Sequence, residues 1–176
     1  MALLKNLPQL SREQKLFLRN AIIAILGWIF IADHYEVQNF FTRILASASG
    51  RVSAFISGEP SKIYGEHYGA TNYVCYNVKD SVGRIFIGWP CNGWDIFYLY
   101  VAFILIFPDI PWKRKALYSV IGVIILFGTN VLRVSLLLQI ITWDPKSFEF
   151  FHKTVFQIVV YLIMFALWLI YLKRRA

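Results

Sequence analysis

The sequence has few charged residues and almost no cysteine. Only 16% of its 176 residues are charged, two are cysteines, and the motifs GxGxxG, GK[ST] and HExxH are absent. Apolar side chains take their place: 58% of the residues are hydrophobic and 18% are aromatic, whereas ordinary soluble domains are about 45–50% apolar. This composition excludes a soluble enzyme, a disordered tail and a zinc-ribbon module. No internal repeat or low-complexity segment is present.

Long apolar runs predict helices that cross a membrane. A helix needs about 20 apolar residues to span a bilayer, and four runs approach this length, at about residues 16–32, 93–107, 116–141 and 154–172. The predicted fold class is therefore an all-α integral membrane protein with about four transmembrane helices in a single membrane domain, residues 1–176. The basic N-terminal flank lacks a small-residue cleavage site after the run, so we expect the first helix to be retained.

The basic residues indicate how the helices are inserted. The net charge of +8 would suggest a nucleic-acid partner in a soluble protein, but these residues flank apolar runs and form no single patch, so none is expected. Three clusters hold ten of the 18 Lys and Arg residues: Lys5, Arg12, Lys15, Arg19, Lys113, Arg114, Lys115, Lys173, Arg174 and Arg175. The positive-inside rule places these clusters and both termini in the cytoplasm. Residues 33–92 then form an extracytoplasmic insert.

The insert is predicted to contain a helix followed by a β-hairpin. From Val37 to Ser57 apolar residues recur at helical spacing with Arg43 and Arg51 between them. This pattern predicts an amphipathic helix on the outer membrane face or against the bundle. A fifth span is the alternative, but it would export the KRK loop. NYVCYNV and RIFIGW, on either side of KDSVG, predict a small hairpin that leads into Cys91.

Three side chains that could take part in catalysis are predicted to lie on the same side of the membrane. Cys91 opens the second span in PCNGWD, where Asn92 is a candidate N-cap and the helix dipole is expected to lower the pKa of the thiol. Arg133 lies inside the third span, about 12 Å below its outer end, and intramembrane charges usually mark functional sites. Asn130 shares its helix face. His152 begins the fourth span, where the dipole favours a neutral imidazole able to accept a proton.

Cysteine, histidine and arginine together supply a nucleophile, a proton-transfer group and a fixed positive charge, which acyl transfer through a thioester requires. Other interpretations stay open: Arg133 could merely hold helices together, and His34 or His67 could take the place of His152. Two cysteines and three scattered histidines show no paired ligand spacing, so no metal or other cofactor is expected.

A disulfide between Cys75 and Cys91 is the structural alternative for the nucleophile. If the hairpin turns near Ser81, Cys75 faces roughly Ile87, and Cys91 lies about 13 Å further along the strand direction. Bridged Cα atoms lie within about 7 Å of each other. This register favours a free thiol at Cys91.

The order and placement of PCNGWD, NVLRVSLL and FFHKTVF resemble the exosortase/archaeosortase family of multipass membrane proteins. The likeness extends from about Pro90 to the C-terminus, and the chain looks closest to the compact members. The resemblance implies a membrane cysteine protease or transpeptidase in which Cys91 is the nucleophile, His152 shuttles protons and Arg133 positions the scissile region or stabilises the oxyanion. We expect Asn92 and Asn130 to support these residues, with Asn130 orienting Arg133.

The resemblance also implies the partners and the location. The substrate would be an exported protein whose C-terminal sorting signal consists of a short motif, a transmembrane helix and a basic cytoplasmic tail. A lipid or glycan would be the acceptor, and water in its place would give simple cleavage. The site would face outward from the cytoplasmic membrane, and the insert up to Trp89 would cover the site or recognise the motif.

The alternative from another class is a non-enzymatic transporter subunit or assembly factor that uses Arg133 in a polar path or lipid-binding site.

Overall fold

The computed structural model of the protein describes residues 10–31, 35–58, 60–65, 73–77, 84–88 and 91–173. The helices are α1 (Arg12–Ile31), α2 (Tyr35–Ser57), α3 (Trp94–Ile106), α4 (Trp112–Trp143), α5 (Phe148–Phe150), the π-helix η3 (Phe151–Val155) and α6 (Phe156–Lys173). The strands are β1 (Ser61–Gly65), β2 (Tyr73–Asn77) and β3 (Arg84–Ile87).

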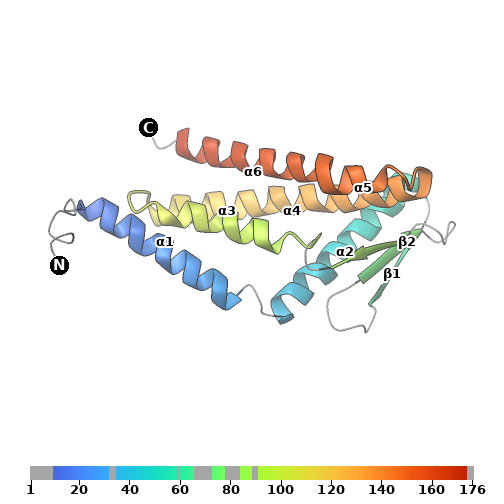
Figure 1. The fold of residues 1–176 in the computed structure, drawn as a ribbon, viewed down its shortest axis with the longest axis horizontal. Coiled ribbons are helices and arrows are strands. Elements are labelled where there is room, and N and C mark those ends of the chain that lie inside the picture. Colours follow the sequence, from blue (N-terminus) through green and yellow to red (C-terminus); the bar gives the residue numbers. More distant parts are fainter. Residues whose placement is uncertain are drawn as a thin grey trace, which may run out of the picture.

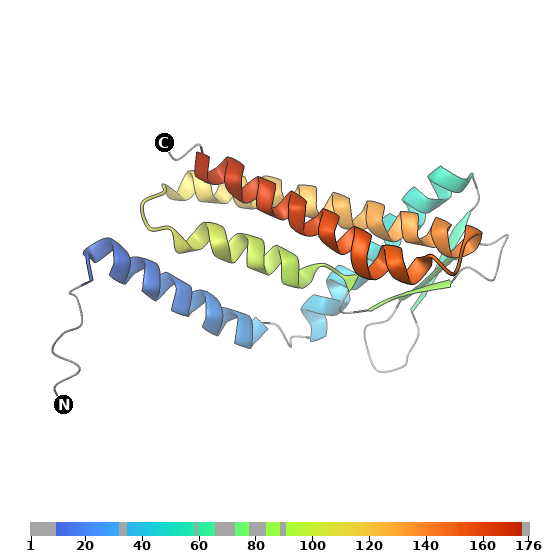
Figure 2. The ribbon, with the colours of Figure 1, turned by 45° about the horizontal axis from the view of Figure 1, so that its top comes forward.

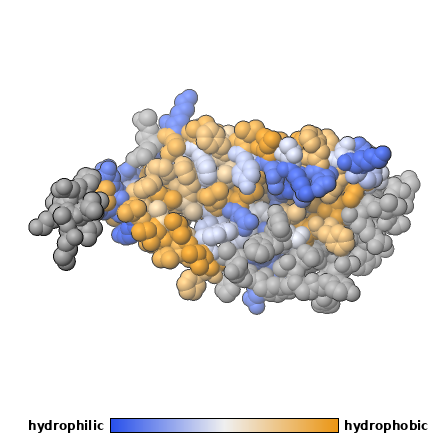
Figure 3. Space-filling view, in the orientation of Figure 1, coloured by the Kyte–Doolittle hydropathy of each residue, from blue (hydrophilic) through white to orange (hydrophobic). Residues whose placement is uncertain are grey.

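The centre of the molecule is a bundle of α3, α4 and α6, which lie side by side along the long axis (Figures 1 and 2). α1 packs against α3 on the outside of this bundle and buries none of its own residues. Apolar surface extends over the helices (Figure 3), and Phe30 of α1 is 84% exposed. Such helix surfaces suit contact with lipid, because lipid tails are as apolar as the side chains they meet.

Among the residues that the structure describes, three helical stretches are long and apolar enough to cross a membrane: α1, α4 and the segment Phe148–Lys173. The second predicted span forms the apolar helix α3, but its 13 residues extend only about 20 Å, against a hydrocarbon core of about 30 Å. α4 has 32 residues and is about 48 Å long, so it exceeds the core. The structure therefore supports a helical membrane protein with three full-length candidates and one short helix.

The bundle has two ends with different construction. At the Lys115 end, α3 stops at Ile106, α4 begins at Trp112, and α6 ends beside them (Figure 1). The Lys115 ammonium donates to the carbonyl of Leu105 at 3.3 Å, and Arg114 donates to that of Tyr171, also at 3.3 Å. These bonds satisfy backbone carbonyls at the C-termini of α3 and α6. The KRK residues, interpreted from sequence as orientation signals, thus also close the helix ends.

The Cys91 end, where α3 begins and α4 ends, carries α2 and the sheet (Figure 1). The predicted helix from Val37 to Ser57 is confirmed as α2, and it packs against the second half of α4. Its buried face unexpectedly includes polar residues. Ser135 Oγ donates to the carbonyl of Ser49 at 3.0 Å, and Gln139 Nε2 donates to Ser53 Oγ at 2.9 Å.

The buried face of α2 is mixed, because small polar residues are buried beside the fully buried Leu45 and Ala46, while large apolar residues are exposed elsewhere on the helix. Thr42, Ser49 and Ser53 are at most 1% exposed, whereas Phe40 and Phe55 are 60% and 90% exposed. Small residues and interhelical hydrogen bonds are the usual means of joining helices in a membrane. The polar seam, defined as these bonds between α2 and α4, fixes the helix along α4.

The sheet is antiparallel, with strand order β1-β2-β3. The two segments predicted to form the hairpin are the strands β2 and β3, which pair antiparallel, whereas β1 was not expected from the sequence. Cys75 pairs with Ile85 and not with Ile87, so the predicted register was wrong by two residues. The KDSVG turn lies outside the described residues. A three-stranded sheet also means that the chain is not purely helical.

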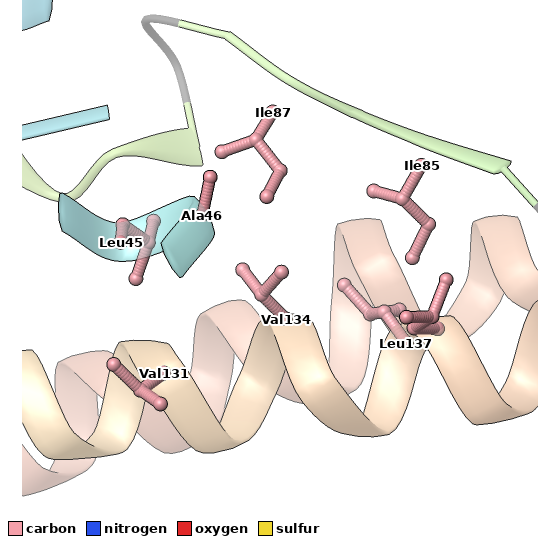
Figure 4. Close-up of a cluster of buried hydrophobic side chains, with 8 residues drawn as sticks. Leu45, Ala46, Ile85, Ile87, Val131, Val134 and Leu137 are labelled. Carbon is pink, nitrogen blue, oxygen red and sulfur yellow. The ribbon is translucent and has the colours of Figure 1, made fainter. Parts of the chain in front are cut away.

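A hydrophobic cluster attaches the sheet to the bundle. Ile85 and Ile87 of β3 point toward Val134 and Leu137 of α4 (Figure 4). Leu45 of α2 completes this contact and is fully buried. The last strand before Cys91 is thus anchored to the helix that carries Arg133.

Candidate active site

The structure brings Cys91 and His152 into contact. Cys91 lies in a short turn between β3 and α3, and His152 lies in η3, 61 positions later in the chain. The Cys91 Sγ atom is 3.5 Å from the Nε2 atom of His152, a separation compatible with a hydrogen bond to sulfur. The pair predicted from sequence is thus placed where the imidazole can accept the thiol proton.

Two hydrogen bonds hold the backbone of Cys91. Its N–H donates to the carbonyl of Gly88 at 2.9 Å, which ties the turn to the end of β3. Its own carbonyl accepts a bond from Asn130 Nδ2 at 3.1 Å. Asn130 was expected to orient Arg133, but its side chain donates a hydrogen bond to the backbone of Cys91. Asn130 therefore positions Cys91.

Asn92 joins the same turn to α2. Its Nδ2 atom donates to Thr42 Oγ1 at 3.2 Å and to the carbonyl of Gln38 at 3.4 Å, and its Oδ1 atom accepts the N–H of Trp94 at 2.9 Å. Asn92 is 1% exposed. It satisfies the first N–H of α3 as predicted, although the N-cap position belongs to the next residue, Gly93.

Gly93 is required by its backbone and by its surroundings. Its φ of +77° lies in the left-handed region, which disfavours residues with a Cβ atom. A Cβ atom here would lie 2.8 Å from Asn130 Nδ2, the atom that binds the Cys91 carbonyl. The glycine therefore permits both the turn and the approach of Asn130.

Arg133 lies on α4, ten residues before its end at Trp143, or about 15 Å along the axis. It is 6% exposed. Within the described part of the chain no hydrogen bond or ion pair to it is found, and its Nε atom is buried without a partner. A buried polar nitrogen without a hydrogen-bond partner is costly.

A pocket of about 340 Å³ joins the three predicted residues. Cys91, Arg133 and His152 all line it. Val134 and Leu137 of α4 contribute apolar walls. Its volume falls in the usual range of small-molecule sites, roughly 300–1,000 Å³. The pocket is thus an apolar cavity with three convergent functional groups.

His152 sits in an unusual backbone. The π-helix Phe151–Val155 interrupts the path from α5 to α6, and such segments often occur at functional sites. The Phe148 ring stacks on the imidazole, with centroids 5.6 Å apart and planes 6° from parallel. Phe148 also lines the pocket. The sequence analysis missed this residue, although its position four residues before His152 is the spacing of helix neighbours.

The thiol of Cys91 does not have the lowered pKa expected from the helix dipole. Burial raises the pKa of the Cys91 thiol, and this effect outweighs the charge of Arg133 and a backbone hydrogen bond with Gly88, which both lower it. The thiol form therefore predominates at neutral pH, and a base is needed to generate the nucleophile. His152 is the group in contact that can serve.

The sequence analysis also raised a disulfide at Cys91, two other histidines and a metal site. Cys91 carries a free thiol, which agrees with the preference against a disulfide. His34 and His67 lie outside the described residues. No cluster of metal-ligating side chains occurs among the residues that the structure describes.

Comparison with known proteins gives one match. The family model for transmembrane exosortases matches residues 17–172. No curated protein and no solved structure matches the chain.

Proposed function

The chain belongs to the transmembrane exosortase family, and on that premise we propose that it is a membrane-embedded cysteine transpeptidase that cleaves C-terminal sorting signals through a thioester. The observation that carries the proposal is the 3.5 Å contact between Cys91 Sγ and His152 Nε2, in a pocket that Arg133 also lines. In this proposal residues 1–176 act as one membrane domain, and residues 33–92 form the insert over the site.

The chemistry begins with transfer of the Cys91 proton to His152 Nε2. The thiolate attacks the scissile carbonyl, and the guanidinium of Arg133 stabilises the negative charge that develops on its oxygen. The C–N bond then breaks, and His152 returns the proton to the leaving amine. A thioester on Cys91 remains. A hydroxyl or amine of a lipid or glycan acceptor, or water, attacks this thioester and regenerates the thiol.

The basic residues support an outward-facing site. Lys113, Arg114 and Lys115 lie at the end of the bundle opposite Cys91, and α6 ends there with Lys173. Because basic clusters remain in the cytoplasm, the Cys91 end would face the exterior of the cytoplasmic membrane. An exported protein held by its own C-terminal helix would present its motif at that surface.

The test uses a reporter fused to the C-terminal region of an exported protein from the same organism that ends in a motif, a transmembrane helix and a basic tail. We expect Cys91→Ala to abolish the mobility shift of the reporter, and Cys75→Ser, the matched control, to leave it intact. Intact-mass measurement should detect an acyl adduct on Cys91 that hydroxylamine removes. Continued processing by Cys91→Ala would contradict the proposal and favour the transporter or assembly role.

Alkylation of Cys91 tests its environment and location. Because the pKa of the buried thiol is raised, labelling by a membrane-impermeant maleimide on intact cells should be slower than for a free cysteine at neutral pH and should accelerate with rising pH. Arg133→Gln removes a charge that lowers the pKa, so labelling at neutral pH should become slower still. A Cys75→Ser background assigns the signal to Cys91. Labelling only after permeabilisation would place the site on the cytoplasmic side.

A further inference from the structure

β3 is an edge strand beside the catalytic pocket. Among the described strands it pairs with β2 alone, so its second edge has no strand partner. In an antiparallel pair, alternate residues of an edge strand direct their N–H and C=O groups away from the partner strand. β3 therefore offers a row of main-chain hydrogen-bonding groups.

The catalytic pocket runs along this open edge. Ile85, Phe86 and Ile87 all line it. Successive side chains of a strand point to opposite faces of the sheet, so a pocket lined by three consecutive residues lies along the backbone and not over one face. β2 occupies the other edge. His152 and Phe148 line the same pocket.

The strand is held rigidly for such a role. Ile85 and Ile87 are 7% and 0% exposed and pack on α4 (Figure 4). The Cys91 N–H bonds to Gly88, directly after the strand. A peptide aligned on β3 would thus be aligned with the nucleophile as well.

We propose that the substrate's sorting motif binds in extended form along the open edge of β3, as a fourth strand of the sheet. This inference rests on the proposed function and specifies how the substrate is held. Strand addition supplies affinity through main-chain hydrogen bonds, while alternate side chains provide specificity. The pocket is also lined by the apolar side chains of Val134 and Leu137 and by the cationic side chain of Arg133.

The geometry also assigns the direction of the added strand. β3 runs from Arg84 toward Gly88 and Cys91, and α3 then continues away from the sheet along the bundle (Figure 2). In the substrate the motif likewise comes before its transmembrane helix. To enter the same membrane, the substrate must run in the direction of β3. The pairing is therefore parallel.

Photo-cross-linking tests the pairing and its direction. p-Benzoylphenylalanine replaces Phe86 or, separately, Arg84, in a Cys91→Ala background that retains the reporter uncleaved. Phe86 is 59% exposed, so the substitution removes little packing, and Phe55 on α2, 90% exposed, is the matched control position. We expect position 86 to cross-link to the motif just before its cleavage site. Position 84 should cross-link about two residues earlier in the substrate, and position 55 should give no product.

The outcomes separate this inference from the proposed function. Absence of cross-links at positions 84 and 86, with processing by the unsubstituted protein intact, would overturn strand addition and leave the enzyme assignment in place. If position 84 cross-links to a substrate residue nearer the transmembrane helix than the residue that cross-links to position 86, parallel pairing is overturned. Processing by Cys91→Ala would refute the thioester mechanism. The cross-links test substrate binding alone, because they form in a protein that cannot cleave the reporter. Thermal unfolding of each substituted protein in detergent, compared with that of the unsubstituted protein, checks that the substituted protein folds.

Discussion

Lys115 and Arg133 are two cations of the same helix, buried to nearly the same degree, in opposite surroundings. They are 7% and 6% exposed, respectively. Lys115 donates to the Leu105 carbonyl at the end of α3. Arg133 has no hydrogen bond or ion pair to any described residue and faces the pocket that contains Cys91 and His152.

The difference separates a charge that closes a helix end from one for which we propose a catalytic role. At the Lys115 end, the cation satisfies a carbonyl that would otherwise lack a partner, so its burial contributes to the fold. At the Cys91 end, the buried Nε atom of Arg133 has no hydrogen-bond partner among the described residues, which is a cost that a ligand's negative charge would offset under the proposed function. Substitutions at the two ends should therefore divide into losses of stability and losses of turnover.

Among the substitutions that compare the two ends, the largest effect is expected from Arg133→Lys. Loss of the planar guanidinium fork should lower the reporter-processing rate by about 100-fold, the typical loss when one oxyanion donor is removed. Thermal unfolding in detergent should change little, because no described protein group depends on Arg133 for a hydrogen bond. If Arg133→Lys processes the reporter at the normal rate, Arg133 has a structural role, as Lys115 does.

The next largest effect is expected from Gly93→Ala. The left-handed backbone costs roughly 1–2 kcal/mol for any residue with a Cβ, and the new atom displaces Asn130 from the Cys91 carbonyl. Displacement of the nucleophile should reduce processing by about 10-fold or more.

Gly58→Ala is the matched control for this change. Gly58 has a φ of +71°, but nothing lies within 4 Å of the position that a methyl group would occupy there. This variant should lose similar stability and keep its processing rate. If both variants lose processing equally, backbone strain and not the contact with Asn130 causes the loss in Gly93→Ala.

A smaller effect is expected from Phe148→Leu, which removes the ring stacked on His152. We expect processing to fall about fivefold, a minor part of what general-base catalysis contributes, with the loss mainly in kcat. Phe148→Tyr keeps the ring and should restore the rate. Phe150→Leu, at a 60% exposed neighbour, is the control, and an equal loss there would show that α5 packing, not the stacked ring, is responsible.

The smallest effect on turnover is expected from Lys115→Met. Loss of its bond to Leu105 should lower the free energy of unfolding by about 1–2 kcal/mol, while each folded molecule should process the reporter at the normal rate. Lys113→Met removes an exposed charge of the same loop and should leave unfolding unchanged. A loss of turnover with unchanged stability in Lys115→Met would contradict the comparison between the two ends.

Much of the architecture could be predicted from the sequence. Apolar run lengths predicted α1, α4 and α6, and periodicity predicted α2, because these signals are local. Cys91, Arg133 and His152 stood out as polar residues in apolar surroundings and by family resemblance. Their convergence on one pocket agrees with that prediction, while their catalytic roles stay predictions.

The rest depended on contacts that local patterns do not encode. Thr42 contacts Asn92 from 50 residues away in the chain. Nothing in the local sequence of α2 indicated that its small polar residues would be buried. The register of β2 against β3 differed by two residues, because a turn of uncertain length fits several pairings. The lower thiol pKa expected from the helix dipole was wrong, since burial by distant segments dominates.

The sequence by itself therefore determined that this is a helical membrane protein, and which side chains are available for chemistry. Run length, charge clusters and motif order are properties of the chain that need no neighbours. Only the tertiary structure decided that Arg133 stays unpaired among the described residues while Lys115 is satisfied, that Asn130 holds the Cys91 backbone, and that β3 presents an open edge to the pocket. Those features depend on which segments meet after packing, and burial and hydrogen bonding exist only between groups that have been brought together.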